Sequence, residues 1–291
     1  MLKIDLHLHT TASDGLLSPA QLVKLAADIG MDIIAVTDHD TVNGIVPALE
    51  AAREFNSLSI IPGVEINTDV PKAEVHMLGY FIDYENGELL ENLSELRSSR
   101  ETRARQMVEK LGKLGIKIQY SRLVELADGG AIGRPHVAHA LLEAGCVSSF
   151  EEAFEKYIGR NAPAYVEHKK MTPLDVVKLI VKSSGGPVLA HPDNIPNLEN
   201  LVKELVLAGL KGMEIYYGDY GEDSIQRLLT IARRYDLIAT GGSDYHAFNS
   251  IKETRIGNAS VPAESARNLI KLALKTNPKM ASRYEFINDQ V

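Results

Sequence analysis

Residues 1–15 read MLKIDLHLHTTASDG, and this stretch decides the fold. Apolar and polar residues alternate over residues 2–8, which is the period of a β-strand. Side chains two positions apart on a strand share a face, so we expect Asp5, His7 and His9 to point the same way. Two imidazoles on one face at the end of a buried strand form a metal-ligand pair, and a solvated or capping histidine pair is the alternative. The rest of the chain decides between these interpretations.

Composition limits the class of protein. The chain has 291 residues, of which 45% are hydrophobic, which suits one large α/β domain or a core domain with an insertion. Its 39 acidic residues outnumber 31 Lys and Arg, and the formal net charge of −8 argues against nonspecific binding of nucleic acid. The single cysteine, Cys146, excludes an intrachain disulfide and a cysteine-based zinc knuckle. The sequence shows neither a signal-peptide pattern nor a membrane-length apolar run, so we expect a cytoplasmic protein without membrane contact.

Strands and helices alternate along most of the chain, which predicts parallel βα units. The expected strands are 2–8, 32–37, 58–62, 74–82, 187–190, 211–216 and 237–241. The expected helices are 18–29, 43–55, 172–184, 197–208, 222–235 and 262–275. Ser18-Pro19 and Thr172-Pro173 each have the pattern of a capping residue followed by proline at the first helical position.

The middle of the chain breaks this alternation. From about Gly87 to Lys170 the pattern is helical and rich in charge, without a good core strand. Helices are expected there at 94–114, 131–144 and 150–157. We therefore predict a discontinuous barrel formed by residues 1–86 and 171–291, with residues 87–170 as an inserted small helical cap domain.

Histidines and carboxylates recur where the predicted strands end. Most of them lie at or just after the C-terminal end of a predicted parallel strand, the face that carries the active site in barrels of βα units. One histidine at such a place is more often structural, but many unpaired imidazoles and carboxylates in one barrel mouth would be costly. Metal ions remove that cost, and mixed His and carboxylate ligands suit Mn²⁺, Fe²⁺ or Zn²⁺. The candidate ligands are His7, His9, Asp14, His39, Glu65, His76, His191, Asp244 and His246.

The motifs that contain these residues resemble those of a known family. In chain order they match the motifs of the polymerase and histidinol phosphatase (PHP) superfamily. The matching segments are HLHTTASDG (7–15), TDHDT (37–41), PGVEI (62–66), HMLG (76–79), LAHP (189–192) and GGSDYH (241–246). The resemblance implies a distorted (β/α)7 barrel that holds three divalent metal ions, with Mn²⁺ the first choice and Fe²⁺ or Zn²⁺ as alternatives.

The resemblance also implies how the ligands divide among the three metals. One metal would be bound by His7, His9, Glu65 and Asp244. A second would be bridged by Glu65 and held by His76 and His191. The third would be held by Asp14, His39 and His246.

The insertion resembles the cap of one subgroup. GRPHVA (133–138), YIGR (157–160) and PAYV (163–166) are similar to the cap of bacterial nucleoside 3′,5′-bisphosphate phosphatases and their 5′→3′ exoribonuclease relatives. This implies removal of the 3′-phosphate from a nucleoside 3′,5′-bisphosphate, with short 5′-phosphorylated RNA or DNA oligonucleotides as further substrates. The segment Tyr217-Gly218-Asp219-Tyr220 departs from the pattern, because relatives often carry a Pro and a His after their paired tyrosines.

The expected chemistry follows from charge. Three ligand carboxylates and three divalent ions leave a site of about +3, which would attract phosphate to an acidic protein. We hypothesise that a metal-bridging hydroxide attacks phosphorus in line. The candidate catalytic side chains are Asp244, His191 and His246, and the sequence does not decide which of them transfers the proton. Glu214, near another strand end, is expected to support a ligand.

Three residues of the insertion are candidates for binding substrate. Arg134 and His136 lie near a predicted helix N-terminus, where an arginine and free N–H groups would hold a second phosphate. A surface arginine beside a helix-starting proline is the alternative. Lys169 lies where the chain rejoins the barrel. Four further arginines are interleaved with glutamates, which is typical of a solvated helix face; they are Arg97, Arg100, Arg103 and Arg105.

Two other functions stay open. One is a histidinol-phosphate phosphatase, against which the inserted cap and its Gly-Arg-Pro-His motif argue. The other is a noncatalytic metal-binding module associated with a polymerase, against which the full set of candidate ligands argues. We expect a small phosphorylated nucleotide as the binding partner and no obligate protein partner.

Overall fold

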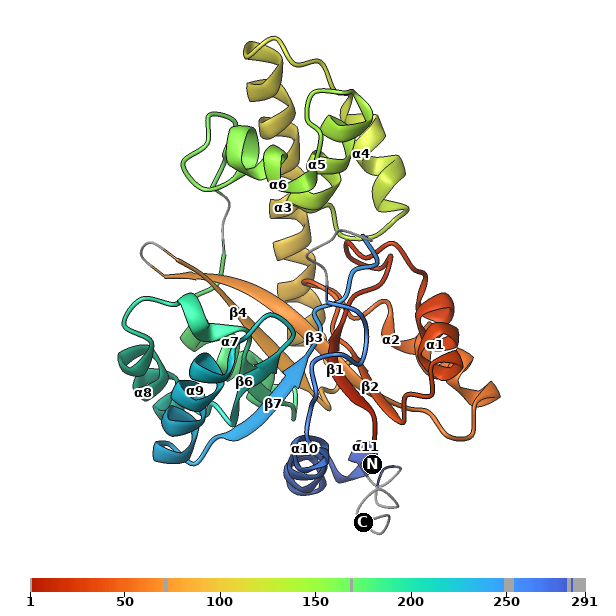
Figure 1. Ribbon diagram of the computed structural model, residues 1–291, viewed down its shortest axis with the longest axis vertical. Coiled ribbons are helices and arrows are strands. Elements are labelled where there is room, and N and C mark those ends of the chain that lie inside the picture. Colours follow the sequence, from red (N-terminus) through yellow and green to blue (C-terminus); the bar gives the residue numbers. More distant parts are fainter. Residues whose placement is uncertain (1, 71–72, 168–169, 249–253, 282–283, 285–291) are drawn as a thin grey trace.

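The computed structural model describes residues 2–70, 73–167, 170–248, 254–281 and 284 (Figure 1). Seven strands in chain order form one sheet. They are β1 (Ile4–Leu8), β2 (Ile33–Val36), β3 (Ser59–Val70), β4 (Ala73–Tyr80), β5 (Gly186–Leu189), β6 (Gly212–Tyr217) and β7 (Ile238–Gly242). Each predicted strand is present, and the third continues well beyond its predicted end at residue 62.

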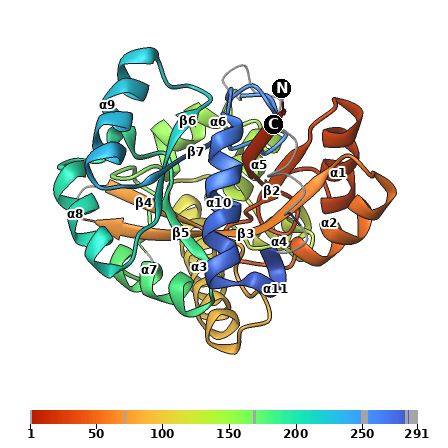
Figure 2. The same ribbon diagram turned by 90° about the horizontal axis from the view of Figure 1, so that it is seen from below.

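The sheet curls into a nearly closed barrel (Figure 1, Figure 2). Leu8 at the end of β1 pairs with Tyr245 after β7 in a parallel bridge. The backbone N–H of His9 donates to the Tyr245 carbonyl, with 3.0 Å between nitrogen and oxygen. The predicted α/β class and the distorted seven-stranded barrel are confirmed.

Strand β4 departs from the predicted alternation of parallel βα units. It runs antiparallel to β3 and to β5, whereas the other neighbouring strands are parallel. The prediction of parallel units is therefore wrong here, because β3 reverses into β4 without an intervening helix. The reversal places the beginning of β4, with His76, at the end of the barrel where the parallel strands finish.

Helices surround the barrel, and one closes its far end. The barrel helices are α1 (Pro19–Asp28), α2 (Ile45–Ala51), α7 (Pro173–Lys182), α8 (Leu198–Ala208), α9 (Glu222–Arg234), α10 (Ala263–Thr276) and α11 (Pro278–Ala281), with short η1 (Ala52–Glu54) and η3 (Pro192–Asn194). Ser18 and Thr172 cap α1 and α7 as predicted. Helix α10 crosses the end opposite the cap (Figure 2) and packs Leu269 and Ile270 into the same core as Leu6 and Ile61 of the barrel. Among the described residues, no helix combines the length and apolarity that crossing a bilayer requires.

The inserted segment forms a group of helices over the other end of the barrel (Figure 1). They are α3 (Gly87–Lys113), α4 (Tyr120–Ala127), α5 (Arg134–Glu143), α6 (Phe150–Ala153) and the π-helix η2 (Phe154–Ile158). Helix α3 begins earlier than predicted, and α4 was not expected. These helices share an apolar core that includes Met107, Leu123 and Leu141. That core supports the predicted cap, whose boundaries at residues 87 and 170 stay a prediction.

We expect Gly242→Ala to destabilise the barrel where it closes. A Cβ atom at Gly242 would lie 2.4 Å from the Cβ of His7 and 2.5 Å from its backbone nitrogen, so β7 would have to separate from β1. Overpacking of this kind costs about 1–3 kcal/mol, which urea unfolding followed by circular dichroism would measure as a lower free energy of unfolding.

Gly87→Ala is the matched control. A Cβ atom there meets no atom within 4 Å, and the position lies in the first turn of α3. Stability should stay the same or rise by up to about 1 kcal/mol. Equal unfolding midpoints for the two variants would contradict this account of barrel closure.

Candidate metal centre

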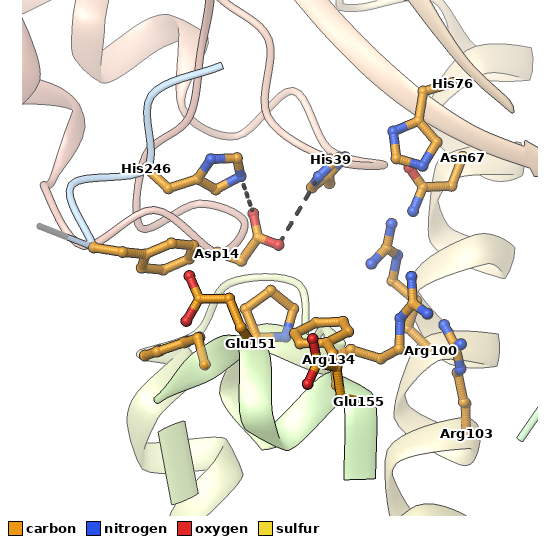
Figure 3. A pocket seen from close by; sticks show the side chains of 14 residues that line it. Asp14, His39, Asn67, His76, Arg100, Arg103, Arg134, Glu151, Glu155 and His246 are labelled. Carbon is orange, nitrogen blue, oxygen red and sulfur yellow. Dashed lines mark ion pairs between the residues drawn. The ribbon is translucent and has the colours of Figure 1, made fainter. Parts of the chain in front are cut away.

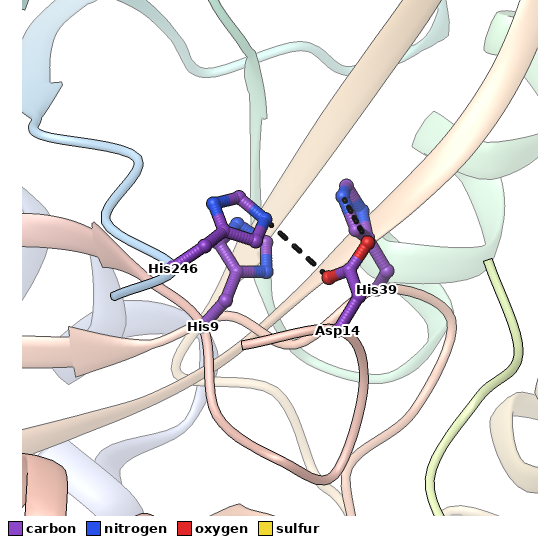
Figure 4. Close-up of side chains that lie close together, drawn as sticks. All are labelled: His9, Asp14, His39 and His246. Atoms are coloured by element: carbon purple, nitrogen blue, oxygen red, sulfur yellow. Dashed lines mark ion pairs between the residues drawn. The ribbon is translucent and has the colours of Figure 1, made fainter. Parts of the chain in front are cut away.

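The nine predicted ligands converge at the end of the barrel that faces the cap. His7 belongs to β1, and His9 and Asp14 follow it, so the first strand and its loop supply three of the nine. The other six come from β3 and β4 or from the loops that follow β2, β5 and β7; they are His39, Glu65, His76, His191, Asp244 and His246. Figure 4 shows His9, Asp14, His39 and His246 turned toward one another from three separate segments.

Glu65 lies at the centre of this cluster and is completely buried. Its two carboxylate oxygens contact five imidazoles. The nitrogen–oxygen distances are 2.8 Å for His39, 2.9 Å for His76, 3.1 Å for His191, 3.3 Å for His7 and 3.4 Å for His9. One carboxylate therefore links imidazoles that come from four separate segments of the chain, since His7 and His9 belong to the same one.

Three overlapping groups of donor atoms could each hold a metal ion. In each group the candidate atoms lie within 4.8 Å of one another. The first group contains His7, His9, Glu65 and Asp244; the second contains His9, Asp14, His39 and His246; the third contains His39, Glu65 and His76. The first group is identical to the ligand set predicted for one metal. The second contains the predicted set Asp14, His39 and His246, with His9 added. The third shares Glu65 and His76 with the remaining set, whose third member, His191, also contacts Glu65.

Many donor atoms of the cluster are buried without an aligned hydrogen bond. His9 Nε2 lies 2.9 Å from Asp244 Oδ1, yet both atoms lack a partner in hydrogen-bonding geometry. Other candidate ligand atoms also lack a hydrogen-bond partner, namely His7 Nε2, Asp14 Oδ1, Glu65 Oε2 and His76 Nε2. Buried polar atoms left in this state are costly, and lone pairs that converge on shared points are what a metal ion requires. The donor set therefore fits divalent cations.

Electrostatics favours metal binding by these side chains. Burial and the nearby His246 and His39 lower the pKa of His9 to about 3, so its imidazole is neutral, as a metal ligand must be. Burial opposes ionisation of Glu65, but the neighbouring His39 and His7 hold the pKa of its carboxyl group well below the usual range. Burial also opposes protonation of His246, yet Asp14 and Asp244 raise its pKa to about 9. Metal binding at His246 would therefore release a proton.

A cavity of about 520 Å³ separates the cluster from the cap (Figure 3). Such a volume is typical of small-molecule sites. Its barrel side is lined by Asp14, His39, Asn67, His76, His246 and Phe248. Its cap side is lined by Arg100, Arg103, Arg134, Pro135, Phe150, Glu151, Phe154 and Glu155. Candidate metal ligands and cap arginines thus face the same space.

Comparison with known proteins identifies the family. Residues 5–173 match the family model of the PHP domain. The chain belongs to the PHP domain family.

Relatives agree with this assignment. The PHP protein is 36% identical over 247 residues to the 5′-3′ exoribonuclease Rnm of Escherichia coli; this match covers 83% of this chain and 84% of the relative. It is 33% identical over 252 residues to the 3′,5′-nucleoside bisphosphate phosphatase of Chromobacterium violaceum; this match covers 85% of this chain and 88% of the relative. A solved structure from Bifidobacterium adolescentis, suggested to be a metal-dependent phosphoesterase, aligns with a TM-score of 0.86 at 28% identity. This alignment covers 93% of this chain and 96% of the solved one. This PHP protein is a metal-dependent hydrolase of phosphate esters.

Three carboxylates that are not candidate ligands hold the ligands in place. Glu214 Oε1 lies 3.0 Å from His7 Nδ1, which leaves Nε2 facing the cluster, and Glu214 Oε2 accepts the backbone N–H of His191. Asp5 accepts the backbone N–H groups of Ser243 and Gly257, which ties β1 to the segments after β7. Asp38 fixes the loop that carries Asp14, because it accepts hydrogen bonds from Thr10 and Ser13.

The side chain of Asp38 accepts the backbone N–H of Thr10 at 2.7 Å and the hydroxyl groups of Thr10 and Ser13 at 2.8 and 2.7 Å. Sequence reasoning expected a supporting role for Glu214 but missed the one of Asp38. The available signal was its position, because Asp38 directly precedes a candidate ligand at a strand end. Tyr217 belongs to the segment noted in the sequence only because it departs from relatives. In the structure its hydroxyl supports a candidate ligand, because it donates to Asp244 Oδ2 at 2.9 Å.

The predicted substrate residues have different positions. Arg134 lines the cavity, with its Nη2 2.5 Å from Glu74 Oε2. His136 is buried at the start of α5, where its Nδ1 accepts the backbone N–H of Gly133, and its role in substrate binding stays a prediction. Lys169 lies outside the described residues. The predicted solvated face of α3 is wrong at Arg100 and Arg103, which are 5% and 6% exposed, because the barrel loop and the end of the insertion cover them.

Removing divalent ions should abolish activity and lower the melting temperature, because the buried donors then lose their shared cation. Returning Mn²⁺ at about 100 times its dissociation constant should restore about 2.7 kcal/mol of stability for each ion that binds, measured by calorimetry. His9→Ala should lose most of this rise, since His9 belongs to two donor groups. His139→Ala is the control, because His139 lies in the cap and its nearest carboxylate is Glu143 at 3.9 Å. An equal Mn²⁺-induced rise in both variants would refute the assignment.

Glu214→Gln should weaken metal binding by roughly 10–100-fold, because the amide cannot replace the charge that orients the His7 ring. Isothermal titration of metal-free protein with Mn²⁺ measures the change. Glu199→Gln, which alters a surface carboxylate paired with Arg234, is the control. Unchanged affinity in Glu214→Gln would show that Glu214 does not orient His7 for binding.

Proposed function

We propose that this PHP protein removes the 3′-phosphate from nucleoside 3′,5′-bisphosphates and leaves nucleoside 5′-monophosphates. The proposed cofactors are three divalent ions, Mn²⁺ in the first place, held by the nine converging ligands. The proposed binding partner is accordingly a small phosphorylated nucleotide.

One observation carries this proposal: the cavity joins the candidate metal ligands to a wall of cap arginines. A substrate with a single phosphate needs only the metal cluster, whereas a substrate with two phosphates can use both walls. The volume of about 520 Å³ and the aromatic side chains of Phe150, Phe154 and Phe248 also suit a nucleoside between the two phosphates. The names of two relatives, a bisphosphate phosphatase and an exoribonuclease, support the same substrate class.

The bound metal ions would supply a hydroxide nucleophile and neutralise charge on the phosphate being cleaved. The side chains Asp244, His191 and His246 are our candidates for proton transfer, because all three lie within the cluster. The Tyr217 hydroxyl donates to Asp244 Oδ2, and His9 Nε2 lies 2.9 Å from Oδ1 without an aligned hydrogen bond. This arrangement fixes its carboxylate while leaving its other lone pairs directed at the site.

Short 5′-phosphorylated oligonucleotides are proposed as further substrates. The first nucleotide of such a chain carries a 5′-phosphate and a phosphate on its 3′-oxygen, as a nucleoside 3′,5′-bisphosphate does. Cleavage would break the same bond, with the rest of the oligonucleotide as an added substituent on phosphorus. Shortening of the oligonucleotide would then proceed from its 5′ end.

The test compares substrates with Mn²⁺-loaded protein. We expect the highest kcat/KM for adenosine 3′,5′-bisphosphate or a 5′-phosphorylated RNA oligomer, and a much lower value for histidinol phosphate. The released products should be inorganic phosphate and adenosine 5′-monophosphate when the bisphosphate is used. Asp244→Ala, which removes a candidate ligand, should lower every rate. A preference for histidinol phosphate would overturn the proposal.

A further inference from the structure

One tyrosine of the barrel wall contacts candidate ligands of two different metals. Tyr217 is the last residue of β6 and is half-buried. Its hydroxyl donates to Asp244 Oδ2 at 2.9 Å, and its ring lies edge to face with the ring of His191, with 5.6 Å between the centroids. Asp244 belongs to the ligand set predicted for the first metal, and His191 belongs to the set predicted for the second. A single side chain therefore connects two neighbouring ligand sets.

An irregularity in β6 turns Tyr217 toward these ligands. In a regular strand, residues three positions apart point to opposite faces, so Tyr217 would point away from the side on which Glu214 contacts His7. The pairing with β7 shifts between Glu214 and Tyr216, because β6 advances two residues while β7 advances one. The extra residue of β6 brings Tyr217 back to the side of Glu214, and re-aiming a side chain in this way is typical of a bulge beside an active site.

Both ligands that Tyr217 contacts have a strained backbone. The φ angle is 26° at His191 and 53° at Asp244, on the positive side that residues other than glycine rarely adopt. Strain of this kind persists only where the surrounding structure holds it in place, and it is concentrated at functional sites. Contacts between Tyr217 and both side chains provide part of that hold.

The Tyr217 hydroxyl determines which oxygen of Asp244 faces the cluster. A tyrosine hydroxyl is protonated at neutral pH and has one hydrogen to donate. Because Oδ2 of Asp244 accepts that hydrogen, Oδ1 is the atom left beside the imidazoles, 2.9 Å from His9 Nε2 and 3.4 Å from His7 Nε2. With its one hydrogen used in this way, Tyr217 supports a ligand and does not donate to a substrate.

Tyr217 is in turn supported from behind. Its ring centroid lies 5.0 Å from that of Tyr220, whose hydroxyl accepts the backbone N–H of Asp193 at 3.0 Å. Asp193 follows His191 by two residues, and its Oδ1 accepts a hydrogen bond from Arg227 of α9 at 2.5 Å. Tyr220 therefore ties Tyr217 to the loop that carries His191.

We propose that Tyr217 is a positioning residue of the metal centre, which fixes the Asp244 carboxylate and the His191 ring relative to each other and so sets the separation of the first two metals. Groups that hydrogen-bond to metal ligands or pack against them control the orientation of those ligands and the affinity of the site. The inference rests on the metals and ligand sets of the proposed function but not on its nucleotide substrate. The effect of Tyr217 is therefore expected to be the same for every phosphate ester that the enzyme cleaves.

Tyr217→Phe tests this role, because it removes the hydroxyl and keeps the ring. Isothermal titration of metal-free protein with Mn²⁺ should show an affinity roughly 10–100-fold below that of the wild type. Electron paramagnetic resonance of the Mn²⁺-loaded variant should show an altered coupling between neighbouring ions. The value of kcat should fall by the same factor on adenosine 3′,5′-bisphosphate and on para-nitrophenyl phosphate, with KM nearly unchanged, since no substrate contact is lost. Tyr235→Phe is the matched control, because its hydroxyl donates to Glu199 of α8 at 3.4 Å.

Tyr220→Leu gives a second measure that leaves Tyr217 and all candidate ligands in place. Loss of the ring behind Tyr217 should lower the Mn²⁺ affinity in the same direction by a smaller factor. Wild-type affinity in both folded variants, with an unchanged resonance spectrum, would overturn the positioning role, as would a rise in KM for one substrate alone. A wild-type protein that binds Mn²⁺ and cleaves para-nitrophenyl phosphate but not the bisphosphate would instead overturn the proposed function.

Discussion

The buried carboxylate of Glu65 is the feature on which the rest of the site depends. It contacts imidazoles from β1, β4 and the loops after β1, β2 and β5, in a place that excludes water. His76 and His191 hydrogen-bond to Glu65 Oε1, but Glu65 Oε2 and the nitrogens of His7, His9 and His39 that face it have no aligned hydrogen bond. A cluster of this kind is tolerable when cations share it, which makes the metal requirement a consequence of the fold rather than an addition to it.

Several irregular features of the barrel serve this cluster. Reversal of β4 brings His76 beside Glu65, and the close approach of Gly242 to His7 joins β1 and β7, which carry or precede three members of the first metal group, His7, His9 and Asp244. Asp5 and Asp38 use buried carboxylates to hold backbone N–H groups of the loops near the ligands. The cap then provides the opposite wall, where arginines rather than carboxylates predominate on the inner face. Candidate metal ligands on one wall and arginines on the other give the cavity two chemically distinct ends.

The sequence predicted the strands and the convergence of the ligands, because both depend on local periodicity and on where each strand ends. It did not predict the direction of β4, since alternation of hydrophobicity is the same in parallel and antiparallel strands. The mistake at Arg100 and Arg103 has a similar origin. Charge spacing along α3 resembles that of a solvated helix, and only the tertiary contacts with Asp40 and the Val166 carbonyl bury that face. The supporting role of Asp38 likewise depends on a loop that is distant in sequence.

The central claim is that Glu65 joins metal sites in one buried cluster. Equilibrium dialysis of metal-free protein against Mn²⁺, followed by elemental analysis, tests it most directly in wild-type protein and in Glu65→Gln. The account predicts three ions per chain in the wild type and the loss of two in the variant, because Glu65 belongs to two of the proposed ligand sets. Retention of the full metal content in a folded Glu65→Gln protein, or binding of no ion by the wild type, would contradict it.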